Sequence, residues 1–358
     1  MISSCPDDAL TARDVMAARA LPGVGDVVLA HSLNDPGAIR ERLGSALAAA
    51  REAAYATADQ MHADALAMGA RVLTLIDEEY PTALRDLADA PAVLFAQGAL
   101  PTALPPAVAI VGTRRASSYG IRVARAIAAT CARAGVSVVS GLAEGIDGAA
   151  HEAALETGGR TVAVLGTGLG VYYPRRHRTL QQRLATEGLV LSELPPGVPG
   201  HGGAFPRRNR LIAALAQVTV VVEAGVGSGA LITAEYAREL GRHVACVPNA
   251  IDVPTSAGSN ALLKDYAEPV LSPDDVLAML TLRATPTVRP VLDADAAAVW
   301  DAVTRGATDV VAIAHASALS VSATSAALTS LELEGLIVVD HLGAVHATIG
   351  AGVTAGRS

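Results

Sequence analysis

Six short apolar runs, each separated from the next by roughly the length of one helix, dominate the middle of the chain. They read AVAIVG, VSVVSG, TVAVLG, LVLSE, VTVVVEA and HVACVP and lie between Ala107 and Leu280. Strands that are apolar along their whole length need cover on both faces, and helix-length connections allow parallel pairing. The pattern therefore predicts an α/β domain with a doubly wound parallel sheet, whose ligands gather at the carboxyl ends of the strands.

Two smaller domains are predicted on either side. Residues 1–68 are alanine-rich with helical periodicity and indicate a small helical domain. Residues 69–106 carry short apolar strands and prolines, so they are assigned as an extension of the central domain, which covers 69–281. A proline-containing linker, 282–291, precedes three helical segments and a hairpin over 292–350, which is the order of a winged helix.

Cysteine usage and hydropathy indicate a cytoplasmic protein. Cys5, Cys131 and Cys246 lack the short spacing of a metal site, and their odd number does not suit a disulfide framework. No run of about 18 apolar residues is free of charges and turn formers, so no membrane span is expected.

The formal charge of −8 argues at first against a nucleic-acid partner. It is unevenly distributed, however. Residues 1–106 hold 7 arginines against 14 acids, and residues 246–358 hold 5 basic groups against 12 acids, so each carries −7. Residues 107–245 hold 15 arginines against 9 acids and carry +6. The α/β domain therefore has room for a local nucleic-acid site.

Glycine-rich turns follow three of the predicted strands. The first carries Gly112, Thr113 and Arg114. Such turns lead into helix N-termini, where backbone N–H groups favour an anion, and the arginine adds a phosphate contact. The spacing is not G-x-G-x-x-G, so no dinucleotide cofactor is expected. A tight turn that only caps a helix stays an equal alternative for this segment. The other two turns contribute candidate ligand-facing residues, Ser140, Gly141, Gly166 and Gly168.

The segment Phe-Pro-Arg-Arg-Asn-Arg is the most specific. Phe205 stands beside Arg207, Arg208, Asn209 and Arg210. An aromatic ring offers a stacking face for a base and adjacent arginines follow a phosphate backbone, as single-stranded nucleic acid requires. The alternative, a core phenylalanine beside a solvated arginine face, is less favoured here.

A further glycine-rich loop follows the strand VTVVVEA. Ser228, Gly229 and Thr233 open its helix and are candidate DNA-binding residues. Glu223 is unusual in an anion site and is expected to organise an arginine by ion pairing, with a sugar or base contact as the alternative.

Asp147 and His151 are spaced i and i+4 on one predicted helix and could share a metal or act as acid and base. A structural role is the better interpretation, because an aspartate in a first turn suits the helix dipole. We therefore assign no catalytic residue, no metal and no cofactor.

Taken together, these segments resemble the DNA processing protein A (DprA/Smf) family. The matching pieces occur in the family's order: AIVGTR with SSYG, VSGLAEGIDGAAH, VAVLGTGL with YP, LSELPPG, FPRRNRLIAAL, VVVEA with SGALITAEYARELGR, and VPNAI with SAGSNALL. The resemblance implies a Rossmann-like central domain with a sterile-alpha-motif-like N-terminal domain. Gly170, Asn249 and 256–260 depart from the family pattern and concern the pocket rim.

The resemblance also implies a function. Members bind and protect incoming single-stranded DNA without a cofactor, form homodimers and load the RecA recombinase during natural transformation. The implied DNA pocket includes Arg114, Phe205, Arg208, Asn209 and Arg210, faced by Ser228, Gly229 and Thr233. Two alternatives remain: a nucleotide-processing enzyme, with Glu144, Asp147, His151 and Glu223 as the residues to suspect, and a relative devoted to phage defence or another regulatory task.

The flanking domains look unsuited to DNA. No lysine or arginine occurs from Gly306 to Gly356, so the winged helix is predicted to pack or to engage a protein instead of duplex DNA. The N-terminal Leu-Pro-Gly-Val-Gly resembles a helix-hairpin-helix turn, but Asp26 follows where a cation would help. A structural role is favoured there too.

Overall fold

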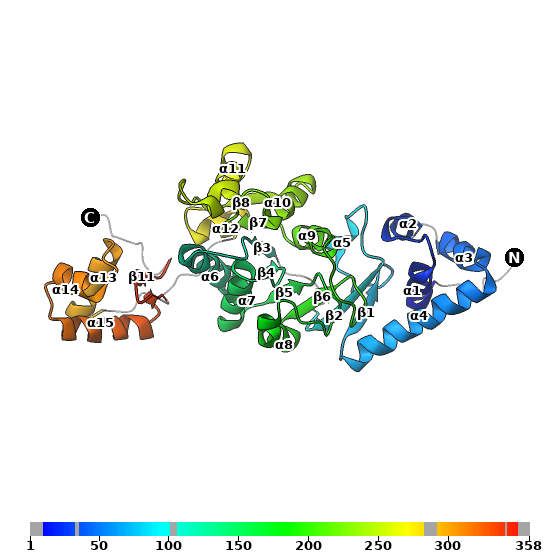
Figure 1. Cartoon of the computed structure of the whole chain (residues 1–358), viewed down its shortest axis with the longest axis horizontal. Coiled ribbons are helices and arrows are strands. Elements are labelled where there is room, and N and C mark those ends of the chain that lie inside the picture. The colour runs from blue at the N-terminus through cyan, green and yellow to red at the C-terminus, as the bar shows by residue number, and fades with distance from the viewer. Residues whose placement is uncertain (1–9, 33–35, 101–105, 283–291, 341, 350–358) are drawn as a thin grey trace.

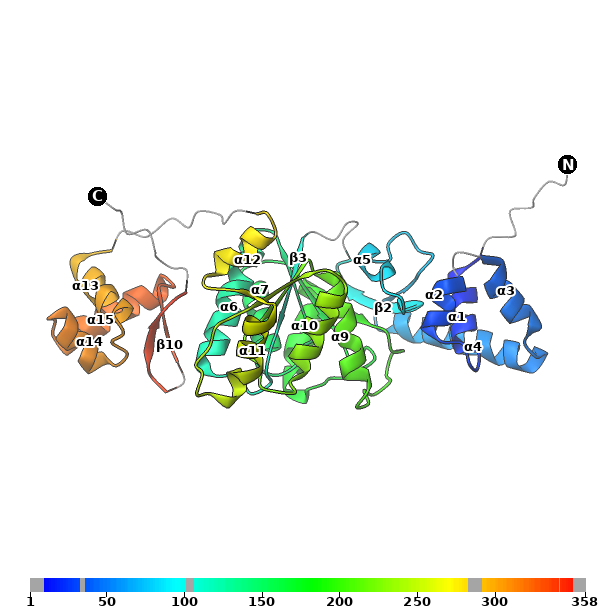
Figure 2. The same ribbon diagram turned by 90° about the horizontal axis from the view of Figure 1, so that it is seen from above.

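The computed structural model describes residues 10–32, 36–100, 106–282, 292–340 and 342–349. Cys5 and nearly all of the predicted linker lie outside these residues. Figures 1 and 2 show a helical unit, a central sheet with its helices, and a small C-terminal unit arranged along the long axis of the molecule.

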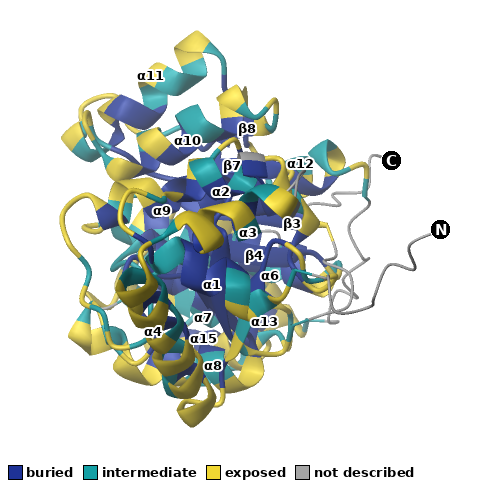
Figure 3. Cartoon of the chain, turned by 90° about the vertical axis from the view of Figure 1, so that its right-hand side faces the viewer, coloured by how far each residue is buried: buried dark blue, intermediate teal, exposed yellow. Residues whose placement is uncertain are grey.

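Four helices form the N-terminal unit: α1 (Ala12–Ala20), α2 (Asp26–Ser32), α3 (Pro36–Ser45) and α4 (Ala48–Ala67). Thr11 starts α1 with a capping box, because its hydroxyl accepts from the Asp14 amide and the Asp14 carboxylate accepts from the Thr11 amide. Figure 3 shows α1 largely buried, whereas α4 exposes its outer face.

The central sheet has nine strands in the order β1-β2-β6-β5-β4-β3-β7-β8-β9. Strands β3 to β9 pair in parallel, and β1 and β2 add an antiparallel edge through β6. The predicted doubly wound sheet is confirmed, and the six apolar runs form β3 to β8. The strands are β1 (Arg71–Thr74), β2 (Val93–Gly98), β3 (Ala107–Val111), β4 (Ser137–Ser140), β5 (Thr161–Val164), β6 (Leu189–Ser192), β7 (Val218–Val221), β8 (His243–Cys246) and β9 (Glu268–Pro269).

Helices cover both faces of this sheet. On β3, Val108 and Ile110 pack with α6, α7 and α12, while Ala109 and Val111 belong to the core shared with α9 and α10, as the alternation of side chains along a strand requires. The helices are α5 (Thr82–Arg85), α6 (Ser118–Arg133), α7 (Ile146–Glu156), η2 (Arg175–His177), α8 (Arg178–Glu187), α9 (Ala204–Leu215), α10 (Gly229–Glu239), η3 (Pro254–Ser256), α11 (Ala257–Asp265) and α12 (Pro273–Met279).

The chain reverses its direction across the sheet between β3 and β7. From β3 it moves outward through β4, β5 and β6, then returns to β7 on the other side of β3 and continues to β8 and β9. In a doubly wound sheet, such a reversal opens a crevice at the carboxyl ends of the two strands. The loops after β3 and β7 therefore flank the expected ligand position.

The C-terminal unit is a winged helix. Its elements are α13 (Ala294–Thr304), α14 (Val310–Ser317), α15 (Val321–Leu333), β10 (Ile337–Val339) and β11 (Val345–Ala347). Asp293, Asp309 and Ser320 cap the three helices with side-chain oxygens. Within the described ranges no single helix could cross a membrane by length and apolar character, although α14 and α15, bent by 103°, meet that test as a pair.

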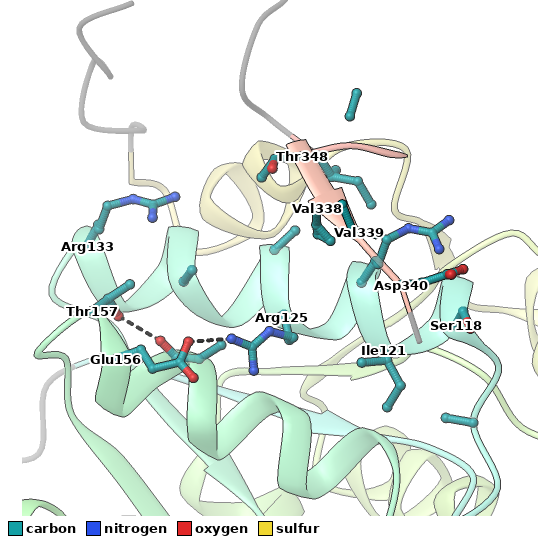
Figure 4. A pocket seen from close by; sticks show the side chains of 17 residues that line it. Ser118, Ile121, Arg125, Arg133, Glu156, Thr157, Val338, Val339, Asp340 and Thr348 are labelled. Carbon is teal, nitrogen blue, oxygen red and sulfur yellow. Dashed lines mark hydrogen bonds and ion pairs between the residues drawn. The ribbon is translucent and has the colours of Figure 1, made fainter. Parts of the chain in front are cut away.

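A cavity of about 450 Å³ lies between α6 and the hairpin of the winged helix (Figure 4). Arg122, Arg125 and Arg133 of α6 line one side, and Val338, Val339 and Asp340 line the other. The hairpin thus lies beside an arginine-bearing helix of the central domain; that this unit does not bind duplex DNA stays a prediction.

Candidate nucleic-acid interface

A cavity of about 990 Å³ lies at the point where the sheet reverses, between the loops after β3 and β7. The turn after β3, the first half of α9, the loop from β7 to α10 and η3 form its walls. Its charged lining residues are Arg114, Arg115, Arg208 and Asp147, so it carries more positive than negative charge. The volume suits a nucleotide-sized group.

One wall contains an arginine and two neighbouring aromatic rings. The guanidinium carbon of Arg114 lies 5.9 Å from the centroid of the Phe205 ring, and that ring lies 5.0 Å from the Tyr173 ring at an interplanar angle of 42°. Arg114 is exposed, and among the described residues it has no carboxylate partner. Its charge therefore remains available to an anion, beside rings on which a base can stack.

The floor contains a buried arginine and a buried aspartate. Arg208 donates from Nη1 to the carbonyls of Gly141, at 2.8 Å, and Val164. Asp147 Oδ2 accepts from the amides of Gly141 and Ala143 at 3.1 and 3.3 Å. A Cβ atom at Gly141 would clash with the Arg208 guanidinium, so glycine is needed at this close approach.

Burial and mutual attraction set the charges of this pair. Burial lowers the pKa of Arg208 to about 10, although the Asp147 charge acts to raise it, so the guanidinium stays charged at neutral pH. Burial raises the pKa of Asp147, opposed by the Arg208 charge and the amide hydrogen bonds. Because its guanidinium is enclosed and bonded to carbonyls, Arg208 supplies positive potential beneath the cavity instead of a mobile phosphate contact.

The loop between β7 and α10 faces this wall. Asn209 Nδ2 donates to the Gly229 carbonyl at 3.1 Å, and the Thr233 hydroxyl donates to the same carbonyl at 3.4 Å. Ser228 caps α10 by accepting from the Ala230 amide. These predicted residues line the cavity together, and Asn209 connects the two walls.

Glu223 does not organise an arginine, contrary to our prediction. Its Oε2 accepts from the Ser117 amide and hydroxyl at 3.0 and 2.7 Å, and its Oε1 accepts from the Thr255 hydroxyl at 2.5 Å. The carboxylate is 1% exposed. It therefore joins the start of α6 to η3, and within the described ranges its partners are these donors and no guanidinium.

Four predicted pocket residues lie behind the walls. Ser140 donates to the Ile110 carbonyl at 2.7 Å. Gly141 holds the Arg208 guanidinium, Gly166 lies against the Phe205 ring, and Gly168 lies against the Pro195 carbonyl. None of the four lines the cavity. They permit close packing beneath it.

Arg207 and Arg210 also lie outside the cavity, on another side of α9. Arg207 Nη2 donates to Asp26 Oδ2 at 2.6 Å. Arg210 donates from Nε to Asp89 and from Nη2 to Glu193, at 2.7 and 2.9 Å. One helical turn separates these positions, so both side chains project in a direction different from that of Arg208.

The acidic and imidazole groups considered for catalysis all have structural contacts. His151 is fully buried, and its Nδ1 lies 2.6 Å from the Thr161 hydroxyl, while its Nε2 has no hydrogen-bond partner. Glu144 pairs with Arg176 at 2.8 Å. In the part of the chain that the structure describes, no group of three or more His, Cys, Asp or Glu residues is arranged to hold a metal ion.

Burial of His151 predicts a loss of stability in mild acid. Burial lowers its pKa to about 3 in the folded protein, below the unfolded value of about 6.5. The unfolded state therefore binds the proton first, and the free energy of unfolding should fall by about 2–3 kcal/mol between pH 6.5 and pH 4.5. Denaturant unfolding of wild type and His151→Gln at both pH values checks this, and equal losses in the two proteins would contradict it.

Sequence reasoning did not assign Tyr173 or the η3 segment to the site. Tyr173 belongs to a Tyr-Tyr-Pro run directly before the basic cluster that begins at Arg175, and that run was the available signal. The η3 segment carries no comparable signal, since only the return of the chain after β8 places Thr255 beside the cavity.

Comparison with models of known families identifies the family of this chain. Residues 71–281 match the model of DNA recombination-mediator protein A, and residues 283–340 match that of the DprA winged helix domain. The chain belongs to the DNA processing protein A family. The residues matched by the first model include every strand of the central sheet and the loops that surround the cavity.

Curated relatives match the central part of the chain. Protein Smf of Synechocystis is 44% identical over 212 residues, covering 58% of this chain and 53% of the relative. A putative DNA processing protein DprA of Mycobacterium tuberculosis is 46% identical over 222 residues, covering 58% and 57%. The matches thus span little more than half the length of these relatives.

Two solved structures of the family are similar. DNA processing protein A from Streptococcus pneumoniae gives a TM-score of 0.67 at 34% identity, covering 75% of this chain and 98% of the other. The protein from Helicobacter pylori, whose structure concerns its single-stranded DNA binding mode, gives 0.54 at 31% identity, covering 59% and 95%.

Proposed function

We propose that this chain binds single-stranded DNA in the cavity between β3 and β7 and acts in DNA processing and recombination. The observation that carries the proposal is the wall in which the Arg114 guanidinium lies over the Phe205 ring, which in turn packs against Tyr173; among the described residues Arg114 has no carboxylate partner. A guanidinium beside aromatic rings can bind the phosphate and the base of a single strand at once, whereas the bases of a duplex are already stacked inside it. Membership of the family and the DNA-binding relative from H. pylori support the same function.

The cellular role is part of this proposal. We infer that the chain protects incoming strands, acts as a homodimer and loads a RecA recombinase during natural transformation, as its family membership suggests. A strand-exchange assay with RecA and a single-strand binding protein tests the loading step. Acceleration by the wild-type chain supports it, and no effect at saturating concentration contradicts it.

Replacing Arg114 with alanine tests the DNA site. We expect weaker binding to all single-stranded sequences alike, and a log–log salt slope that is shallower by about 0.7, because one phosphate contact is lost. Fluorescence anisotropy with labelled single and double strands at several salt concentrations measures both quantities. Arg183→Ala is the matched control, since Arg183 pairs with Glu187 away from the cavity. Equal affinities for wild type and Arg114→Ala would remove the basis of the proposed site.

A further inference from the structure

Six charged side chains form a continuous chain of ion pairs between the N-terminal helical unit and α9. We call them the interdomain charge cluster: Arg19, Asp26, Arg207, Glu193, Arg210 and Asp89. Asp26 links the two parts, because it accepts from Arg19 of the N-terminal unit at 2.7 Å and from Arg207 of α9 at 2.6 Å. Asp26 also accepts from the Ala92 amide at 3.3 Å.

The cluster is electrically balanced, and two of its members are buried while Arg19, Arg207 and Asp89 are partly exposed. Asp26 is 6% exposed and Arg210 is 3% exposed. Burial acts to lower the pKa of Arg210, but Glu193 and Asp89 outweigh it and the pKa is raised. Three guanidinium groups face three carboxylates, so the cluster adds no net charge that could attract DNA. The ion pairs instead hold the N-terminal helical unit and α9 in fixed positions relative to each other.

The same helix carries the cavity wall. On α9, Phe205, Arg208 and Asn209 line the cavity, whereas Arg207 and Arg210 join the cluster. The two sets alternate within two turns of one helix, so they cannot move independently. A rotation of α9 that separates Arg207 from Asp26 would therefore also shift Phe205 relative to Arg114.

We propose that the interdomain charge cluster is a clamp through which the N-terminal helical unit positions α9 for DNA binding. Asp26 is thus a positioning residue for the site and makes no contact with DNA. Asp26, which makes the N-terminal turn unsuited to phosphate, instead forms an ion pair with Arg207 of the central domain. The inference deepens the proposed function and rests on it.

The substitution Asp26→Asn in the full chain tests the clamp. The clamp and simple electrostatics predict changes in DNA affinity of opposite sign. Removing a negative charge from the protein should slightly strengthen binding to DNA. The clamp predicts instead that affinity for single strands falls by about three- to ten-fold, within the range found for residues that act through coupling. The salt slope should stay at the wild-type value because no phosphate contact is lost.

Two further variants make the comparison specific. Asp59→Asn removes the same charge from the exposed pair with Arg13 in the same unit and should leave the affinity unchanged. Asp26→Glu keeps a carboxylate and should restore most of the binding. Hydrogen–deuterium exchange without DNA should show faster exchange over 204–215 in Asp26→Asn than in Asp59→Asn.

The outcomes separate the clamp from the DNA site. Unchanged exchange over 204–215 in Asp26→Asn overturns the clamp, as does tighter binding with a steeper salt slope, which would mean that Asp26 withholds Arg207 from DNA. Faster exchange together with weaker binding at an unchanged slope supports it. If wild type itself binds no single strands, the proposed function fails, and the exchange measurement still decides whether the clamp exists.

Discussion

Replacing Arg208 with methionine should destabilise the central domain by about 3–5 kcal/mol, because it leaves the buried Asp147 carboxylate without its positive neighbour. The Gly141 and Val164 carbonyls would also lose their donor. For a domain of this size, the expected fall in the melting temperature is about 6–20 °C. Differential scanning calorimetry at pH 7 measures it.

Asp147→Asn provides the control for that prediction. Once residue 147 is neutral, the loss of the guanidinium should cost less, so the double variant should be more stable than the sum of the two single effects implies. Strict additivity would contradict a coupled buried pair. It would leave the hydrogen bonds of Arg208 as the whole of its contribution.

Much of the fold could be predicted because one local pattern determines it. The six runs that became β3 to β8 are apolar on both faces, and only a parallel sheet covered on two sides buries such strands. The antiparallel edge could not be derived in the same way. Strands β1 and β2 reach the sheet through a pairing between Phe95 and Ser192, a contact between distant segments that no local pattern reports.

The candidate site was predicted in part, and the errors on α9 have one cause. Phe205, Arg208 and Asn209 share a side of α9, and this could have been derived from the spacing of a helix, in which i, i+3 and i+4 are neighbours. Treating Phe-Pro-Arg-Arg-Asn-Arg as a continuous patch made Arg207 a DNA-binding candidate and placed Arg210 in the pocket, whereas both pair with carboxylates outside the cavity. The carboxylates that pair with those two arginines lie 17 to 181 positions away from them in the sequence.

The distribution of charge along the sequence also predicts the site only in part. The central domain holds the excess of positive charge, but pairing removes part of it from the surface. Arg183 and Arg125 pair with nearby glutamates, and Arg176 pairs with Glu144. Counting by sequence locates the basic domain. Only the contacts show that Arg114, at the cavity, has no carboxylate partner in the described part of the chain.

Replacing Phe205 with alanine should weaken single-strand binding by about 1–3 kcal/mol, or roughly 5- to 150-fold, if its ring stacks on a base. The ring lies between Arg114 and Tyr173, so alanine removes the centre of this wall. The salt slope should not change, because a stacking contact releases no counterion. Weaker binding at a constant slope therefore distinguishes Phe205 from Arg114, whose loss makes the slope shallower.

Phe205→Tyr and Tyr173→Ala complete the comparison. Tyrosine keeps an aromatic face and should retain most of the affinity, since stacking needs a ring and not a particular substituent. Tyr173 is 48% exposed at the outer end of the wall, so its loss should cost less than that of Phe205. If Phe205→Ala binds as tightly as wild type while Arg114→Ala does not, the cavity holds the strand by its phosphates alone and the aromatic wall serves only to support Arg114.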